Sequence, residues 1–121
     1  MKKLPDAEFE VMRVIWENTP PLTTKQIMEY LDPNKEWKPQ TVLTLLVRLT
    51  ERGFITSEKK GKERHYFPII KEEEYLAEET KAFMSKFHKN SFASLFSAFF
   101  RGSKVSKQDI EELEKWMRER K

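Results

Sequence analysis

The residues best suited to chemistry lie on one face of a predicted helix that begins at Pro39 and ends before Gly53. That face carries short uncharged side chains first and a cation further along: Gln40, Thr41, Leu43, Thr44, Val47 and Arg48. Amide, hydroxyl and methyl groups suit the base edges of a DNA major groove, with hydrogen bonds donated by the threonines and a thymine methyl contacted by Leu43. An ordinary amphipathic helix on a soluble domain stays open as the alternative for this stretch alone.

Positive side chains in and after this helix could supply a second kind of chemistry, the neutralisation of phosphates. Residues 34–67 carry a net charge of +4, against −2 for residues 1–33 and +1 for residues 68–121. The excess positive charge therefore lies where a phosphate-contacting surface needs it. We expect the backbone contacts to come from Lys38, Arg48, Lys59, Lys60, Lys62 and Arg64. Arg48 has an alternative role as the ion-pair partner of Glu51 or of a carboxylate in a second copy.

Other chemistry has few residues to draw on. The 121 residues include no cysteine, only three glycines, and two histidines, His65 and His88, without a carboxylate at helical ligand spacing. No nucleophile has an adjacent base, so we expect no metal, no cofactor and no enzyme activity. No apolar run approaches the roughly 18 residues of a membrane span, and no secretory signal is present. These features predict a cytoplasmic protein without direct membrane insertion.

Three short helices are predicted to position the central face. The first runs from Asp6 to about Asn18, and the second is capped by Thr23 or Thr24. In the third, Pro39 suits the first turn, Gly53 suits the exit, and an apolar stripe repeats at helical spacing: Val42, Leu45, Leu46 and Leu49. The second and third helices, joined by a short polar connection, form a helix-turn-helix with the third in the reading position.

A β-hairpin is predicted directly after Gly53. Residues 54–56 and 64–69 are typical of strands, and the basic stretch 59–62 is typical of the turn between them. Lysines at a hairpin tip also occur because turns are exposed and edge strands are protected by charge. Following three helices, the hairpin is better explained as a wing beside the DNA backbone.

The C-terminal third is predicted to be helical and strongly apolar. It is too small to enclose so many large side chains alone, so we expect it to form a homodimer; an intramolecular core is the alternative. The dimerisation residues would be Leu76, Phe83, Phe87, Phe92, Leu95, Phe96, Phe99, Ile110, Leu113 and Met117. The predicted fold is mainly α with a small β-hairpin wing: a winged helix-turn-helix domain over residues 1–70 and a helical dimerisation region over residues 71–121.

With these elements placed, the chain resembles the penicillinase and methicillin-resistance repressors. The matching residues include the run Glu8–Met12, the motif Trp37-x-Pro-x-Thr41-Val42-x-Thr44-Leu45-Leu46-x-Arg48-Leu49, and the exit Gly53-Phe54-Ile55. Phe92-x-Ser94-Leu95 and Ile110–Leu113 extend the likeness over nearly the whole chain.

The resemblance implies a homodimer that binds a palindromic operator upstream of antibiotic-resistance genes. It also implies release by a sensor-protease system that cuts an Asn-Phe bond in the short C-terminal helix. The aligned bond in this chain is Ala98–Phe99, and Leu43 stands where those repressors carry Arg.

The combined hypothesis is a homodimeric transcriptional repressor that occupies double-stranded operator DNA in an antibiotic-resistance or cell-wall-stress operon. The rival is a winged-helix protein–protein interaction module that uses the same face without binding DNA.

Overall fold

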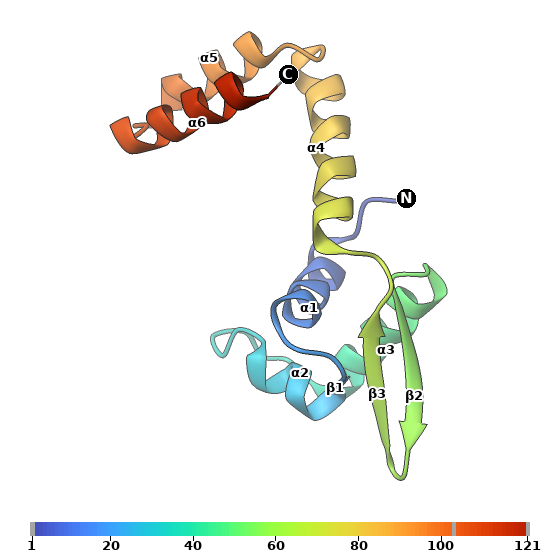
Figure 1. Ribbon diagram of the computed structural model, residues 1–121. Helices are drawn as coiled ribbons and strands as arrows, with labels where there is room; N and C mark the ends of the chain where they lie inside the picture. Colours follow the sequence, from blue (N-terminus) through green and yellow to red (C-terminus); the bar gives the residue numbers. More distant parts are fainter. Residues whose placement is uncertain (1, 103, 121) are drawn as a thin grey trace. The chain divides into compact units, whose positions relative to one another are not determined.

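The computed structural model describes residues 2–102 and 104–120, and these contain six helices and three strands (Figure 1). The chain divides into two compact units, residues 1–79 and 80–121. The first unit holds α1 (Asp6–Glu17), β1 (Leu22–Thr23), α2 (Thr24–Tyr30), α3 (Pro39–Glu51), β2 (Ile55–Lys60), β3 (Glu63–Pro68) and the start of α4 (Glu72–His88). The second holds the rest of α4, α5 (Phe92–Gly102) and α6 (Lys107–Glu119).

Helix α1 buries four apolar side chains and one acidic side chain. Val11, Met12, Val14 and Ile15 are buried, and so is Glu8. An acidic residue in the first turn complements the helix dipole, which is how the sequence alone explains Glu8. In the structure, Glu8 also forms a salt bridge with Arg52 at the end of α3, a partner that the spacing in the sequence does not reveal.

The start of α2 is fixed by a reciprocal pair of hydrogen bonds. The Gln26 backbone N–H donates to Thr23 Oγ1 at 3.2 Å, and the Thr23 N–H donates to Gln26 Oε1 at 2.9 Å. This capping box satisfies two backbone donors that the first turn leaves without helical partners. The cap is therefore Thr23 rather than Thr24.

Helix α3 has the boundaries and the buried face that its sequence predicted. Pro39 lies in the first turn, and Val42, Leu45, Leu46 and Leu49 are buried. After the helix, Gly53 adopts a φ of +79°, a left-handed conformation that costs glycine little. The chain then reverses into the hairpin, with the Phe54 N–H donating to the Leu49 carbonyl at 3.0 Å.

The sheet has three antiparallel strands in the order β1-β3-β2, so the predicted hairpin gains a short third strand. In β1, Leu22 pairs with Tyr66 and Thr23 with His65. The turn is also tighter than predicted, because Lys59 and Lys60 belong to β2 and only residues 61 and 62 connect the strands. Gly61, at a φ of +63°, permits this short connection.

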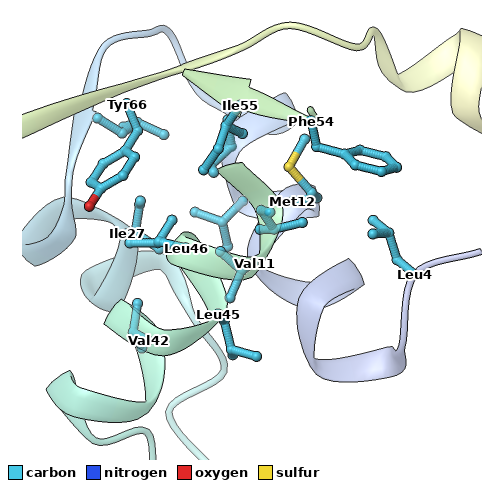
Figure 2. Close-up of a cluster of buried hydrophobic side chains, with 14 of the residues drawn as sticks. Leu4, Val11, Met12, Ile27, Val42, Leu45, Leu46, Phe54, Ile55 and Tyr66 are labelled. Carbon is cyan, nitrogen blue, oxygen red and sulfur yellow. The ribbon is translucent and has the colours of Figure 1, made fainter. Parts of the chain in front are cut away.

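The core of the first unit lies between the three helices and the inner face of the sheet. Figure 2 shows Val11 and Met12 from α1, Ile27 from α2 and Leu46 from α3 converging beneath Ile55 and other hairpin residues. Tyr75, in the first turns of α4, belongs to the same core and is 3% exposed. The start of α4 therefore packs with the winged unit, and residue 70 as the functional boundary stays a prediction.

The second unit leaves most of its large apolar side chains exposed, although Met84 is buried. Helices α5 and α6 have no buried residue, although Ser106 caps α6 by accepting the Asp109 N–H at 3.0 Å. Ile110, Leu113 and Met117, which the sequence predicts as dimerisation residues, are 37%, 37% and 58% exposed in the single chain, and their role stays a prediction. Within the second unit, the described residues form no buried core over α5.

Candidate nucleic-acid interface

The outward face of α3 is the centre of the candidate site. The four residues predicted to face bases, Gln40, Thr41, Leu43 and Thr44, are all exposed. Val47 lies on the same face and is 56% exposed, one turn beyond Leu43. The buried stripe on the opposite face holds the helix in the core and thereby fixes which side chains point outward.

The Thr44 hydroxyl is already used as a donor within the helix. Its Oγ1 donates to the Gln40 carbonyl oxygen at 3.0 Å, a bond to the residue four positions earlier. The sequence predicted Thr44 as a hydrogen-bond donor to a base, but in this conformation the side chain presents acceptor lone pairs and a methyl group. A base amino group is therefore the better match for Thr44 than a base carbonyl.

The predicted phosphate-binding cations are exposed but do not form one patch. Lys38 occupies the position just before the first turn of α3, and Arg48 lies in the last turn. Among the described residues no salt bridge joins Arg48 to Glu51, so the intrachain alternative for Arg48 is not found. The wing cations are the remaining four: Lys59, Lys60, Lys62 and Arg64.

Strand register separates the wing cations onto two faces. Ser57 pairs with Tyr66 and Lys59 with Arg64, so these residues share the face that carries buried Ile55. Lys60 pairs with Glu63 on the opposite face. On the first face, Arg64 Nη1 donates to Ser57 Oγ at 3.0 Å, which holds the guanidinium over the strand.

Two adjoining grooves lie beside the hairpin, one against α3 and the other against the start of α2. One, of about 400 Å³, is lined by Leu43, Leu46, Val47, Thr50, Glu51, Ser57, Arg64 and Tyr66. The other, of about 390 Å³, is lined by Thr23, Thr24, Lys25, Leu43, Lys62, Glu63, Arg64 and Tyr66. Leu43, Arg64 and Tyr66 line both grooves, so the third helix and the wing meet at these three side chains. Sequence reasoning did not assign Val47 a role, although its spacing of four residues from Leu43 is the signal that could have done so.

A further cation near the start of α3 is already paired. Lys35 Nζ forms a salt bridge with Glu10 Oε1 of α1, and the hydrogen bond that Lys35 donates to this carboxylate raises the pKa of Lys35. Because its charge is matched locally, Lys35 adds little to the positive surface around α3. The pair instead joins the loop before α3 to α1.

The described residues contain no group of three or more His, Asp or Glu side chains arranged to hold a metal ion. Nor does any helix in the described part of the chain combine the length and apolar character needed to cross a membrane.

The predicted dimerisation residues mostly lie on exposed surfaces. Phe83, Phe87, Phe92 and Phe99 are 46–69% exposed, and Leu76 is 43% exposed. Leu95 and Phe96 are half-buried within α5. Phe92 and Phe96 stack with ring centroids 6.5 Å apart, which aligns them along one side of the helix.

Three helices, a hairpin and an outward third helix define a winged helix-turn-helix domain, a class of DNA-binding unit. The model of the penicillinase repressor family matches residues 4–119. The chain therefore belongs to the penicillinase repressor family, as its motifs predicted. Family members are transcriptional repressors, which confirms the expectation that the chain is not an enzyme.

Relatives and solved structures agree on this family. The penicillinase repressor of Bacillus licheniformis is 32% identical over 124 residues, covering 100% of this chain and 96% of the relative. The methicillin resistance regulatory protein MecI of Staphylococcus aureus (strain N315) is 33% identical over 111 residues, covering 92% and 89%.

Among solved structures, the DNA binding domain of the repressor BlaI matches with a TM-score of 0.53 and 37% identity, covering 62% of this chain and 94% of that one. The monomeric form of Bacillus licheniformis BlaI in complex with the blaP half-operator matches with a TM-score of 0.51 and 35% identity, covering 61% and 89%.

Proposed function

We propose that this protein is a homodimeric repressor that blocks transcription in the cytoplasm by occupying a twofold operator of a β-lactam-resistance type operon. The observation that carries the proposal is the exposed face of α3, flanked by cations, in a chain of the penicillinase repressor family. A relative of the same fold is described in complex with a half-operator, which favours DNA over a protein partner for this face.

The division of labour follows from the positions of the side chains. Gln40, Thr41, Leu43 and Thr44 face the bases, and Lys38 and Arg48 hold phosphates on either side of the helix. Lys59 and Arg64 contact the phosphates next to α3, because they lie on the face of the hairpin that meets α3. Lys60 and Lys62 contribute mainly through long-range attraction at the tip.

A second copy of the chain is the proposed cover for the second unit. Nine large apolar side chains between residues 80 and 121 are exposed in the single chain: Phe83, Phe87, Phe92, Phe99, Phe100, Ile110, Leu113, Trp116 and Met117. Monomeric proteins seldom expose so many together, and the surface marks an interaction site. Pairing two recognition helices on one twofold site also increases operator affinity and specificity.

The same exposed surface of the second unit also suggests how the repressor is released from DNA, namely by disruption of the dimer. Ala98 and Phe99 lie on α5 and are exposed, so the aligned bond is at the surface of the single chain. Cutting there separates α6 from α4 and removes part of the proposed interface. The partner for this step is a sensor-protease system that responds to a cell-wall antibiotic.

The residue roles are tested with duplexes selected from a randomised library. Thr44→Ala should weaken binding by about 1–3 kcal/mol and relax the preference at one base pair per half-site. Lys59→Ala should weaken binding to all duplexes about equally. Lys71→Ala, a matched loss of an exposed cation outside α3 and the wing, should leave binding unchanged. No shift of any duplex at low salt by the unsubstituted chain would overturn the proposed function.

Release is tested by mass spectrometry of the repressor recovered from cells before and after antibiotic exposure. The proposal expects fragments that end at or near Ala98. An intact chain throughout, while the target promoter switches on, would rule out cleavage as the release step.

A further inference from the structure

Two apolar side chains are exposed on the outward face of α3. Leu43 is 39% exposed and Val47 is 56% exposed, and they are four residues apart, hence neighbours on the helix surface. Both line the groove between α3 and the hairpin, together with Tyr66 and Arg64. They form one continuous apolar strip on the side of α3 that faces the wing.

The choice of residues on this strip is costly for a surface helix. Val is a weaker helix former than Lys, Glu or Gln because its branched side chain loses rotamer freedom. Apolar side chains that stay exposed to water also do not stabilise the fold by burial. A single exposed apolar residue is ordinary, but two adjacent ones beside a groove form a contact surface. The strip therefore has to be explained by what it contacts.

Charge identifies the kind of molecule that contacts it. Lys38 and Arg48 lie on α3, and Lys59, Lys62 and Arg64 lie on the hairpin, so exposed cations flank the strip on both of these elements. This pattern matches a polyanion whose phosphates flank an apolar feature, and it fits poorly to an apolar protein segment. In the DNA major groove the apolar feature of a base pair is the C5 methyl group of thymine.

We propose that Leu43 and Val47 together recognise 5-methylpyrimidines at two neighbouring base-pair positions of each half-site. The inference rests on the proposed operator binding and assigns Val47 as a specificity-determining residue. Thr44, whose hydroxyl donates to Gln40 within the helix, lies beside this strip and adds its own methyl to the apolar surface. The operator of this protein should therefore carry thymines under the strip, where an arginine at position 43 would favour guanine.

The test removes only the methyl group. Each thymine of a duplex selected from a randomised library is replaced, one at a time, by deoxyuridine, which keeps the base pair and lacks the C5 methyl. We expect two positions per half-site at which this replacement weakens binding by roughly fourfold per methyl, the value of one buried methyl-sized group. Replacing the same bases by 5-methylcytosine, with guanine opposite, should restore part of the loss relative to cytosine.

Protein variants then link each methyl to its side chain. In Val47→Ala, the deoxyuridine penalty should disappear at one of the two positions, and in Leu43→Ala at the other. Alanine is the better helix former, so both variants retain the α3 helix. Ile69→Ala is the matched control, because Ile69 is also 56% exposed but follows β3 and does not line the groove. It should keep both penalties.

The outcomes separate this inference from the proposed function. Tight binding of the selected duplex with no deoxyuridine penalty, or with penalties that survive both variants, overturns methyl recognition and leaves operator binding standing. Failure to bind any duplex overturns the proposed function itself.

Discussion

Glu8 of α1 and Arg52 at the end of α3 form a salt bridge of 2.6 Å between Oε2 and Nη1. The Glu8 side chain is only 1% exposed, whereas that of Arg52 is 37% exposed. The second carboxylate oxygen, Oε1, is buried and has no hydrogen-bond partner among the described residues. One guanidinium therefore compensates a buried carboxylate and joins the C-terminal end of α3 to α1.

The asymmetry in burial predicts an asymmetry between variants. Arg52→Ala leaves a buried carboxylate unpaired and should lower the free energy of unfolding by about 3–5 kcal/mol. Glu8→Gln removes the charge, keeps the shape and should cost less. Adding Glu8→Gln to Arg52→Ala should recover stability. Urea denaturation of the four proteins measures this cycle, and a double variant less stable than Arg52→Ala would contradict it.

Tyr75 should make stability fall in alkaline solution. Its hydroxyl oxygen accepts the Leu4 N–H at 2.8 Å, and burial of the ring raises the pKa of Tyr75 above its ordinary value. Because the folded chain holds this proton more tightly than the unfolded chain, the contribution is fully present below the unfolded pKa of about 10 and is lost as pH rises through the folded pKa.

Tyr75→Phe is the matched variant. It leaves the buried Leu4 N–H without a partner, at a cost of about 1–3 kcal/mol near neutral pH. It should also flatten the alkaline decline in the free energy of unfolding. An equal decline in both proteins would assign the alkaline effect to other groups.

Operator binding should weaken steeply with salt. Cations on α3 and the hairpin of both copies displace condensed counterions, and about six to ten phosphate contacts lower affinity by ~10³–10⁵ between about 50 and 200 mM salt. Arg64→Ala and Lys59→Ala should each reduce the slope by about two, because each substitution removes one phosphate contact from each copy. Near-constant affinity over this range would count against the phosphate contacts.

Two truncations should separate folding from dimerisation. A chain ending at Glu79 keeps Tyr75, whose ring lies 5.6–5.8 Å from those of Phe9, Trp16 and Phe54, and should be a folded monomer. A chain ending at Ile70 loses that ring and should be about 3–5 kcal/mol less stable. Sedimentation and urea denaturation measure the two properties. A dimeric 1–79 chain would place the interface in the first unit.

Local signals were enough to predict the elements that hold the site. Pro39, the stripe from Val42 to Leu49 and Gly53 fixed α3 because each acts within a few residues of its own position. The exposed face followed directly, since burial of one face of a helix decides the other.

Features that depend on distant partners could not be predicted in the same way. Glu8 resembles an ordinary first-turn acid until Arg52, 44 residues away, is placed beside it. With only two residues, β1 is too short to be predicted as a strand from its sequence pattern. It forms a strand only because it pairs with the edge of β3. The wing cations look alike in sequence, yet a shift of one residue in register moves a side chain to the other face.

Thr23 ends one element and begins the next: it pairs with His65 of β3 and caps α2. The hairpin and the helix-turn-helix thus share this residue, and displacing the wing would also disturb the cap. The wing is held in position before DNA arrives. The wing therefore loses less conformational entropy when it binds the phosphates, and this preorganisation increases the affinity for the operator.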